Sequence, residues 1–394
     1  MTALRWPLHP RPGPVEALSS WLDRTARVYD LSAADLLHHN LGAASFTLAG
    51  RDDLDLDWDP PREVLAALAE RTGLRLAELA PMTMAGWVPW LMDSLGPGTG
   101  QEMFGTYVRQ HSVLLRPGEA GRNQVSMWLP WVPAQPARLA CPACAVDPQR
   151  GSMLMWRLPH MARGPEHGCL LQPVPDVRFA VLAGGEPQPV PASPHVAAVD
   201  QYTFRALTTG RVSLPGGSVH AGVWFRLLRT LIDEVSTAPS ALSAPSRAAL
   251  ELIWSRADMP VRGGLAVWRP YERLTWPAQQ AMAGAAAAAV HLAGSGEITA
   301  RGTLGRYLAR EPHRDVYEGD RRAWEWKQAV AELDAMISQA RTDPDTARQV
   351  LVTLTAASRT FAGFYRERQY LIGLGIPDEH LPDHRALRRT DLSP

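Results

Sequence analysis

The chain has 394 residues, and its 40 basic and 40 acidic side chains give a formal net charge of zero. That balance excludes a uniformly basic nucleic-acid coat protein, but it allows nucleic-acid binding through a local basic surface. Three cysteines are too few for a disulfide-stapled secreted scaffold, and no apolar segment reaches the roughly 20 residues that a membrane span needs. We therefore expect a cytoplasmic protein without a membrane segment.

The N-terminal region predicts an extended strap followed by two short helices. Residues 7–14 include four prolines, which fix φ and exclude a helix. A helical period runs from Val15 to Ala26, and a second short helix should begin after Ser32, because its hydroxyl is a good N-cap. The two helices form a helix-turn-helix candidate.

A second helix-turn-helix candidate follows. Residues 62–72 have helical periodicity, Gly73 suits a left-handed residue after the helix end, and a helix restarts over 75–79. This pair carries little positive charge, so packing is favoured over DNA contact. The preceding residues 52–59 alternate acidic and apolar side chains, and we interpret them as a solvated loop.

The most specific chemical pattern involves cysteine and histidine. Cys141-Pro-Ala-Cys144 places two thiolates three positions apart, which can bind one Zn²⁺ from a single turn. His167 offers a third ligand. The fourth ligand stays open, because His160 and Cys169 are the nearest candidates and neither has an ordinary ligand spacing.

The Cys-x-x-Cys pattern also has other interpretations. A thioredoxin-like redox pair is disfavoured, since residues 145–148 do not open a good helix. The cysteines can also be buried small residues. No catalytic signature such as H-E-x-x-H, a P-loop or G-x-S-x-G occurs in the chain. A metal hydrolase with water as the fourth ligand is the least favoured interpretation, because the sequence does not identify a general base. We therefore expect that the protein is not an enzyme.

The C-terminal half predicts mainly helices. Residues 183–198 are rich in proline and read as a linker. Beyond them we expect helices over 222–235 and over an alanine-rich stretch that begins after Thr275 and ends at Gly294-Ser-Gly296. Two long helices, about 321–341 and 344–374, favour an antiparallel hairpin.

An arginine-bearing segment follows the alanine-rich helix. Thr299 should cap a helix over residues 300–310, which would follow a glycine turn as in proteins that place a second helix in the major groove. A solvated amphipathic helix with its arginines outward is the alternative. We predict that four residues contact DNA: Arg301, Thr303, Arg306 and Arg310.

Three stretches share the order and spacing of one protein family. Pro10-Arg-Pro12 with residues 16–24 reads P-x-P…E-x-L-x-S-W-L-x-R, and residues 138–171 read R-x-x-C-P-x-C…W-R-L…P-x-H-G-x-L-L. Residues 207–228 are the third stretch. Together they resemble the TniQ/TnsD family of transposition target-selection proteins, in the form of its actinobacterial-type members.

The resemblance implies a non-enzymatic adaptor. Such proteins link target recognition, by their own DNA-binding domains or by the guide-RNA effector complex of a CRISPR-associated transposon, to an AAA+ ATPase that recruits the transposase. A homodimer is a further expected partner. The runner-up is a stand-alone helix-turn-helix DNA-binding regulator. Partner docking is assigned to the strap and the first helix, through Pro10, Pro12, Glu16, Trp21 and Arg24.

The resemblance also implies a degenerate zinc site. Cys141, Cys144 and His167 match ligand positions, whereas Gly164 stands where the family has a cysteine, and residues 173–176 replace a second C-x-x-C pair. We expect a mainly α fold, with helix-turn-helix units around a small zinc-ribbon-like module and a C-terminal helical hairpin. The expected domains are the strap region 1–135, the zinc-finger-like module 136–182, the linker 183–198 and the helical domain 199–394.

Overall fold

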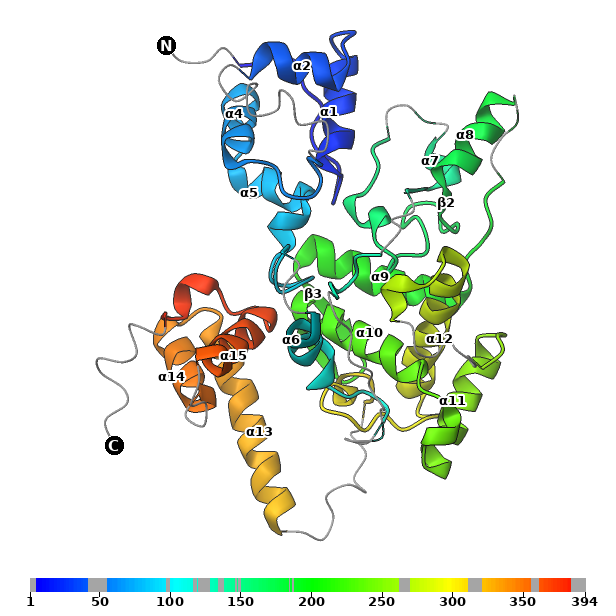
Figure 1. Cartoon of the computed structure of the whole chain (residues 1–394), viewed down its shortest axis with the longest axis vertical. Helices are drawn as coiled ribbons and strands as arrows, with labels where there is room; N and C mark the ends of the chain where they lie inside the picture. The colour runs from blue at the N-terminus through cyan, green and yellow to red at the C-terminus, as the bar shows by residue number, and fades with distance from the viewer. Residues whose placement is uncertain are drawn as a thin grey trace. The chain divides into compact units, whose positions relative to one another are not determined.

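The computed structural model divides into two compact units, and each is built from segments that are far apart in the sequence (Figure 1). Unit 1 comprises Met1–Val88, Trp131–Thr208 and Thr275–Gln280, and unit 2 comprises Pro89–Pro130, Thr209–Leu274 and Ala281–Pro394. The residues that the structure describes are 5–41, 55–96, 100–115, 119, 128–133, 138–145, 147, 150–183, 185, 188–261, 270–310, 321–355 and 361–383. They are mainly helical with little strand, which confirms the predicted fold class.

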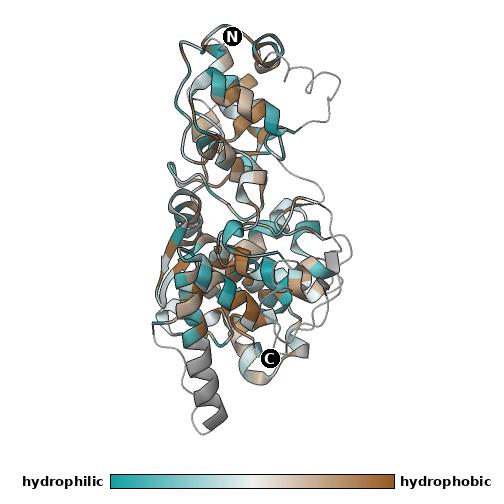
Figure 2. Ribbon diagram, turned by 90° about the vertical axis from the view of Figure 1, so that its left-hand side faces the viewer, coloured by the Kyte–Doolittle hydropathy of each residue, from teal (hydrophilic) through white to brown (hydrophobic). Residues whose placement is uncertain are grey.

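Both predicted helix pairs of unit 1 are present and share one core. The helices are α1 (Leu18–Arg27), α2 (Ala33–Asn40), α4 (Arg62–Thr72) and α5 (Leu76–Leu79). The core residues, buried on the inward faces of these helices, include Trp21, Leu22, Leu36, Val64 and Leu68. Figure 2 shows hydrophobic and hydrophilic residues on the same helices, as amphipathic packing requires.

The ends of these helices follow local rules. The Ser32 side chain accepts a hydrogen bond from the backbone N–H of Asp35 at 3.1 Å and so caps α2. Gly73 has φ +77° and ends α4, in the left-handed conformation that glycine adopts at low cost. Both features were predicted from the sequence.

The acidic stretch before α4 differs from the solvated loop that we expected. Residues 55–59 form a turn, but Asp57 is buried and accepts 2.7 Å hydrogen bonds from the backbone N–H and the hydroxyl of Ser19. Arg157 donates to Asp55 and Asp57. These carboxylates therefore join α1 to a distant segment, a role that periodicity cannot reveal. Residues 52–54 lie outside the described part of the chain.

The rest of unit 1 holds the cysteine region. β1 (Leu139–Ala140) pairs antiparallel with β2 (Gln172–Pro173), in the register Leu139↔Pro173 and Ala140↔Gln172. The other elements are the one-turn helix α7 (Pro142–Ala145), the 3-10 helix η4 (Leu154–Arg157), α8 (Val174–Leu182) and α9 (Pro194–Thr209). α9 begins inside the segment expected as a linker, so residues 194–198 are helical.

Unit 2 is assembled around the apolar helix α10. Its elements are α6 (Gly100–Phe104) with the π-helical turn Gly105–Arg109, the hairpin of β3 (Arg211–Leu214) and β4 (Gly217–His220), α10 (Ala221–Val235), α11 (Ala244–Arg256), α12 (Trp276–Ser295), α13 (Arg321–Ala340), α14 (Pro344–Thr355) and α15 (Phe361–Gly373). α13 and α14 pack against each other and confirm the predicted hairpin (Figure 1). The single helix expected over 344–374 is described as α14 and α15; residues 356–360 lie outside the description.

Two arginines of α10 are buried among carboxylates of unit 2. Arg226 is 0% exposed and donates to Asp93 at 2.6 Å, with its guanidinium carbon 4.3 Å from the centre of the Tyr107 ring. Arg229 is 1% exposed and donates to Glu272 at 2.8 and 3.1 Å. Buried ions need such partners, because an unpaired charge in the interior costs several kcal/mol.

The helix predicted over residues 300–310 is not formed; the segment holds the 3-10 turn η8 (Gly305–Tyr307). The backbone N–H groups of Arg301 and Gly302 donate to the carbonyl of Val113 at 2.9 and 3.2 Å. A Cβ at Gly302 would lie 1.9 Å from the Ser112 carbonyl carbon, so glycine permits this close approach. Backbone N–H groups of this segment thus donate to residues 112–113, and they are not available for the hydrogen bonds of an α-helix.

We predict that Glu272→Ala destabilises unit 2 by about 3–5 kcal/mol, because it leaves the Arg229 charge buried without its carboxylate. The matched control is Glu78→Ala, which removes a partner of the 80% exposed Arg75 and a capping hydrogen bond of α5, and which should destabilise the chain far less. Urea denaturation of the two variants measures the difference. Equal stabilities would contradict the assignment of Glu272 as the required counter-ion.

Candidate metal centre

The strand pair β1–β2 positions the cysteine and histidine side chains. Cys141 directly follows β1, and the single turn of α7 carries Cys144 back toward it. The chain then returns through a loop that ends at Leu171, the residue before β2, and this loop carries His167. Pairing of two very short strands therefore brings residues 26 positions apart into contact.

The three predicted metal ligands converge. Cys141 Sγ lies 3.6 Å and Cys144 Sγ 3.3 Å from Nδ1 of His167, and the three ligand atoms lie within 4.8 Å of one another. Cys141 is buried, whereas His167 is exposed. Two thiolates and an imidazole are the donors that zinc prefers, so this group could hold a metal ion.

The pKa values of Cys141 and Cys144 are shifted in opposite directions. A hydrogen bond from the Cys141 thiol lowers the pKa of Cys144, while the same interaction and burial raise the pKa of Cys141. Cys144 therefore loses its proton more readily than Cys141. A bound cation would favour ionisation of both sulfurs, because metal ligands must be deprotonated.

Gly164 faces this cluster. A Cβ built at Gly164 would lie 3.0 Å from Cys141 Sγ. A cysteine at this position, as the family resemblance leads one to expect, would therefore stand next to the first ligand. Glycine leaves the position without a donor.

Sequence reasoning missed Asp200, which holds the ligand loop from α9. Its buried carboxylate accepts hydrogen bonds from the backbone N–H groups of Ala162 and Arg163 at 3.2 and 2.9 Å. Arg163 also donates to the Ala197 carbonyl at 2.9 Å. No local signal marks Asp200, because its partners lie in another segment, and the expected boundary at residue 199 separated it from them.

The residues predicted for partner docking form a network within unit 1. Trp21 Nε1 donates to the Pro10 carbonyl at 2.8 Å, and Arg24 forms a 2.7 Å ion pair with Glu16. Glu16 is 3% exposed and also accepts from the backbone N–H of Gly13 at 2.7 Å. These side chains hold the strap against α1. Pro12, the fifth residue of the set, is half-buried in the strap.

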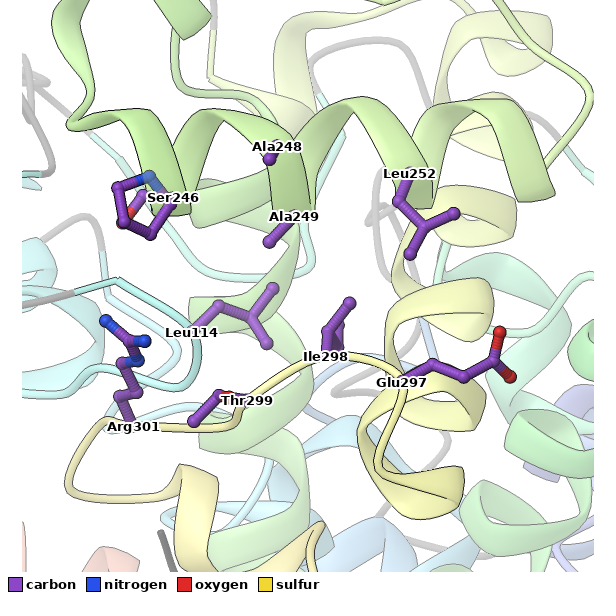
Figure 3. Close-up of a pocket in the computed structure, with 10 residues that line it drawn as sticks. Leu114, Ser246, Ala248, Ala249, Leu252, Glu297, Ile298, Thr299 and Arg301 are labelled. Atoms are coloured by element: carbon purple, nitrogen blue, oxygen red, sulfur yellow. The ribbon is translucent and has the colours of Figure 1, made fainter. Parts of the chain in front are cut away.

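The residues predicted to contact DNA lie in different surroundings. Arg301 lines a pocket of about 250 Å³, at the opposite end from Glu297 (Figure 3). Arg306 forms an ion pair with Asp334, and its guanidinium carbon lies 4.7 Å from the centre of the Tyr307 ring. Thr303 accepts a 3.2 Å hydrogen bond from the backbone N–H of Ser112. Arg310 is exposed.

We predict a pH-dependent stability that depends on Asp200. Burial raises the pKa of its carboxyl from 3.8 to about 7, against the lowering effect of Arg163 and of the two backbone donors. Between these values the folded chain binds a proton that the unfolded chain lacks, so the stability from this group is complete at low pH and falls as pH rises to about 7.

The test compares the wild type with Asp200→Asn, which cannot titrate. Urea unfolding across this pH range should show the wild type losing stability relative to the variant, by up to about 1.4 kcal/mol per pH unit. Other groups titrate in both proteins and cancel in the difference. Parallel stability curves would contradict the prediction.

Comparison with known proteins supports one family. Residues 7–171 match the TniQ family, a span that includes the strap, both helix pairs, β1 and the three ligands, and that ends just before β2. No curated protein and no solved structure matches the chain. Among the described helices, none has both the length and the apolar character of a membrane span. The TniQ domain is associated with target selection in transposition, and residues 7–171 of this chain match that domain.

Proposed function

We propose that this protein is a non-catalytic adaptor in targeted DNA transposition. It links recognition of the target, either as DNA or through a guide-RNA effector complex, to an AAA+ ATPase that recruits the transposase. The observation that carries the proposal is the match over residues 7–171, which spans both the strap and the metal ligands. A contact with partner proteins and DNA also agrees with a chain whose net charge is zero but whose arginines are locally grouped.

We assign zinc as the metal of Cys141, Cys144 and His167. The ion would tie the turn after β1 to the loop before β2, and its role there is structural. Such a site contributes folding free energy directly, because the ligands are brought together only in the folded chain. Zinc binding would keep the module rigid, and binding surfaces on rigid elements lose less entropy when a partner docks.

The strap is the surface that we assign to the ATPase. Its backbone is fixed on both sides of Leu8, since the N–H and the carbonyl of that residue both bond to the Tyr29 hydroxyl, at 2.9 and 2.5 Å. The Leu8 side chain is 61% exposed. An apolar side chain presented by a fixed backbone is suited to fill a pocket on a partner.

The first test is capture of the purified AAA+ ATPase of a TniQ-bearing transposon by the immobilised chain. We expect retention of the ATPase, and we expect Leu8→Asp to weaken it by about tenfold or more, because the change buries a charge at the contact. Leu76→Asp is the matched control, since Leu76 is 52% exposed and belongs to α5 rather than to the strap. Failure of capture together with specific binding of an operator DNA would favour the stand-alone regulator instead.

DNA contact is assigned to the segment around η8, through Arg301, Thr303, Arg306 and Arg310. The exposed Arg310 and the pocket-lining Arg301 are the cations of this set best placed to reach phosphates. Arg306 contributes less in this arrangement, because Asp334 already neutralises it. The contacts would thus come from an irregular segment rather than from a recognition helix.

The second test measures duplex DNA binding at several salt concentrations. The double variant Arg301→Ala with Arg310→Ala should bind more weakly, and the slope of log K against log salt should fall by about 1.8, since each phosphate contact contributes about 0.9. Arg75→Ala removes an exposed arginine from unit 1 and should leave the slope unchanged. An unaltered slope in the double variant would exclude this segment as the DNA contact.

A further inference from the structure

We propose that Cys169 is the fourth ligand of the metal site, which becomes a Cys₃His site formed by Cys141, Cys144, His167 and Cys169. The inference rests on the zinc site proposed above and deepens it. Its starting point is a contact between two sulfurs: Cys169 Sγ lies 3.4 Å from Cys141 Sγ, and both residues are buried. The family pattern does not place a ligand at this position.

The separations between donor atoms are close to those in a tetrahedral zinc site. With Zn–S near 2.3 Å and Zn–N near 2.0–2.1 Å, tetrahedral geometry puts two sulfurs about 3.8 Å apart and a sulfur and a nitrogen about 3.6 Å apart. The observed contacts are 3.3 and 3.6 Å between sulfur and nitrogen, and 3.4 Å between sulfurs. Cys169 thus stands at a ligand-to-ligand distance from the most buried member of the group.

The conformation of the loop explains how a cysteine at position 169 can take the place of one at position 164. The backbone N–H of Gly164 donates to the carbonyl of Cys169 at 3.0 Å, and the N–H of Gly168 donates to the carbonyl of Gly164 at 2.9 Å. Gly168 has φ +67°, which turns the chain tightly enough for this closure. The two positions are therefore adjacent in space, and both face Cys141.

The sulfur of Cys169 has a hydrogen-bond donor in the backbone of the ligand turn. The backbone N–H of Ala143, in the turn between the two ligand cysteines, hydrogen-bonds to its sulfur. Backbone donors of this kind stabilise a thiolate charge. Cys169 Sγ is outside the group of three atoms that all lie within 4.8 Å of one another, so it joins the ion by turning about its Cα–Cβ bond.

The other candidate for the fourth ligand, His160, is engaged elsewhere. Its ring packs against Trp131 with 4.9 Å between ring centres, and burial lowers its pKa to about 3. The ring is therefore a neutral member of the apolar core. Of the two candidates that the sequence left open, only Cys169 has a contact with a ligand sulfur among the described residues.

The experiment uses the full chain with zinc, and with cobalt as a spectroscopic substitute. The wild type should bind one equivalent of zinc, and its cobalt form should show thiolate-to-metal charge transfer from three sulfurs. Cys169→Ser should reduce this absorption to that of two sulfurs and release zinc to a competing chelator about tenfold or more faster. Cys169→Ala is the second variant and should behave alike, with circular dichroism confirming that each protein is folded.

The outcomes separate the two proposals. Cys144→Ser tests the zinc site itself, and its loss of zinc with unaltered metal binding in both Cys169 variants would overturn the role of Cys169 alone. A wild type that binds no zinc would overturn the zinc site and the fourth ligand together. A disulfide between Cys141 and Cys169 in the zinc-loaded chain, detected by mass spectrometry without reduction, would also overturn the inference.

Discussion

Buried carboxylates determine how this chain is assembled, because each must receive hydrogen-bond donors before it can be removed from water. In unit 1, Glu16 collects donors from the strap and α1, and Asp200 collects them from the loop at residues 162–163. In unit 2, Glu234 accepts from the backbone of Val113 and Leu114, with distances of 2.7 to 3.1 Å. Asp200 and Glu234 receive these donors from segments that are far away in the sequence, whereas the donors to Glu16 are its neighbours along the chain. These carboxylates therefore tie together segments whose apolar side chains form the cores.

This constraint explains which elements could be predicted from the sequence. The caps at Ser32 and Gly73 depend on residues within one helical turn, so the bounds of α2 and α4 follow from local rules. The segment 300–310 has helical periodicity too, and Leu304 and Leu308 are buried as that pattern indicates. Its backbone nevertheless bonds to residues 112–113, whose position depends on Glu234. Contacts between segments almost 200 residues apart thus outweigh the local helical propensity. No pattern within residues 300–310 can reveal such contacts.

In the metal centre, too, some ligands could be predicted from the sequence and one could not. Two cysteines three positions apart identify a ligand pair, and His167 follows in the family order, so three donors could be named from the sequence. The contact of Cys169 depends instead on the left-handed turn at Gly168 and on the hydrogen bond between Gly164 and Cys169. In the sequence, the glycine at position 164 indicates that a ligand of the site has been lost. In the structure the same glycine lies beside a buried cysteine, and this changes the interpretation from a lost ligand to a displaced one.

The strap and the metal module are parts of one hydrogen-bonded assembly in unit 1. The N–H of Ala17 donates to the Ser152 carbonyl, and the N–H of Leu154 donates to the Val15 carbonyl, each at 2.9 Å. The N–H of Ser152 also donates to the Ser20 hydroxyl at 2.7 Å. The segment at residues 152–154 is thus hydrogen-bonded to the residues that join the strap to α1. Since docking costs less entropy when the contact surface is already fixed, a metal at the cysteines would strengthen partner binding without touching the partner.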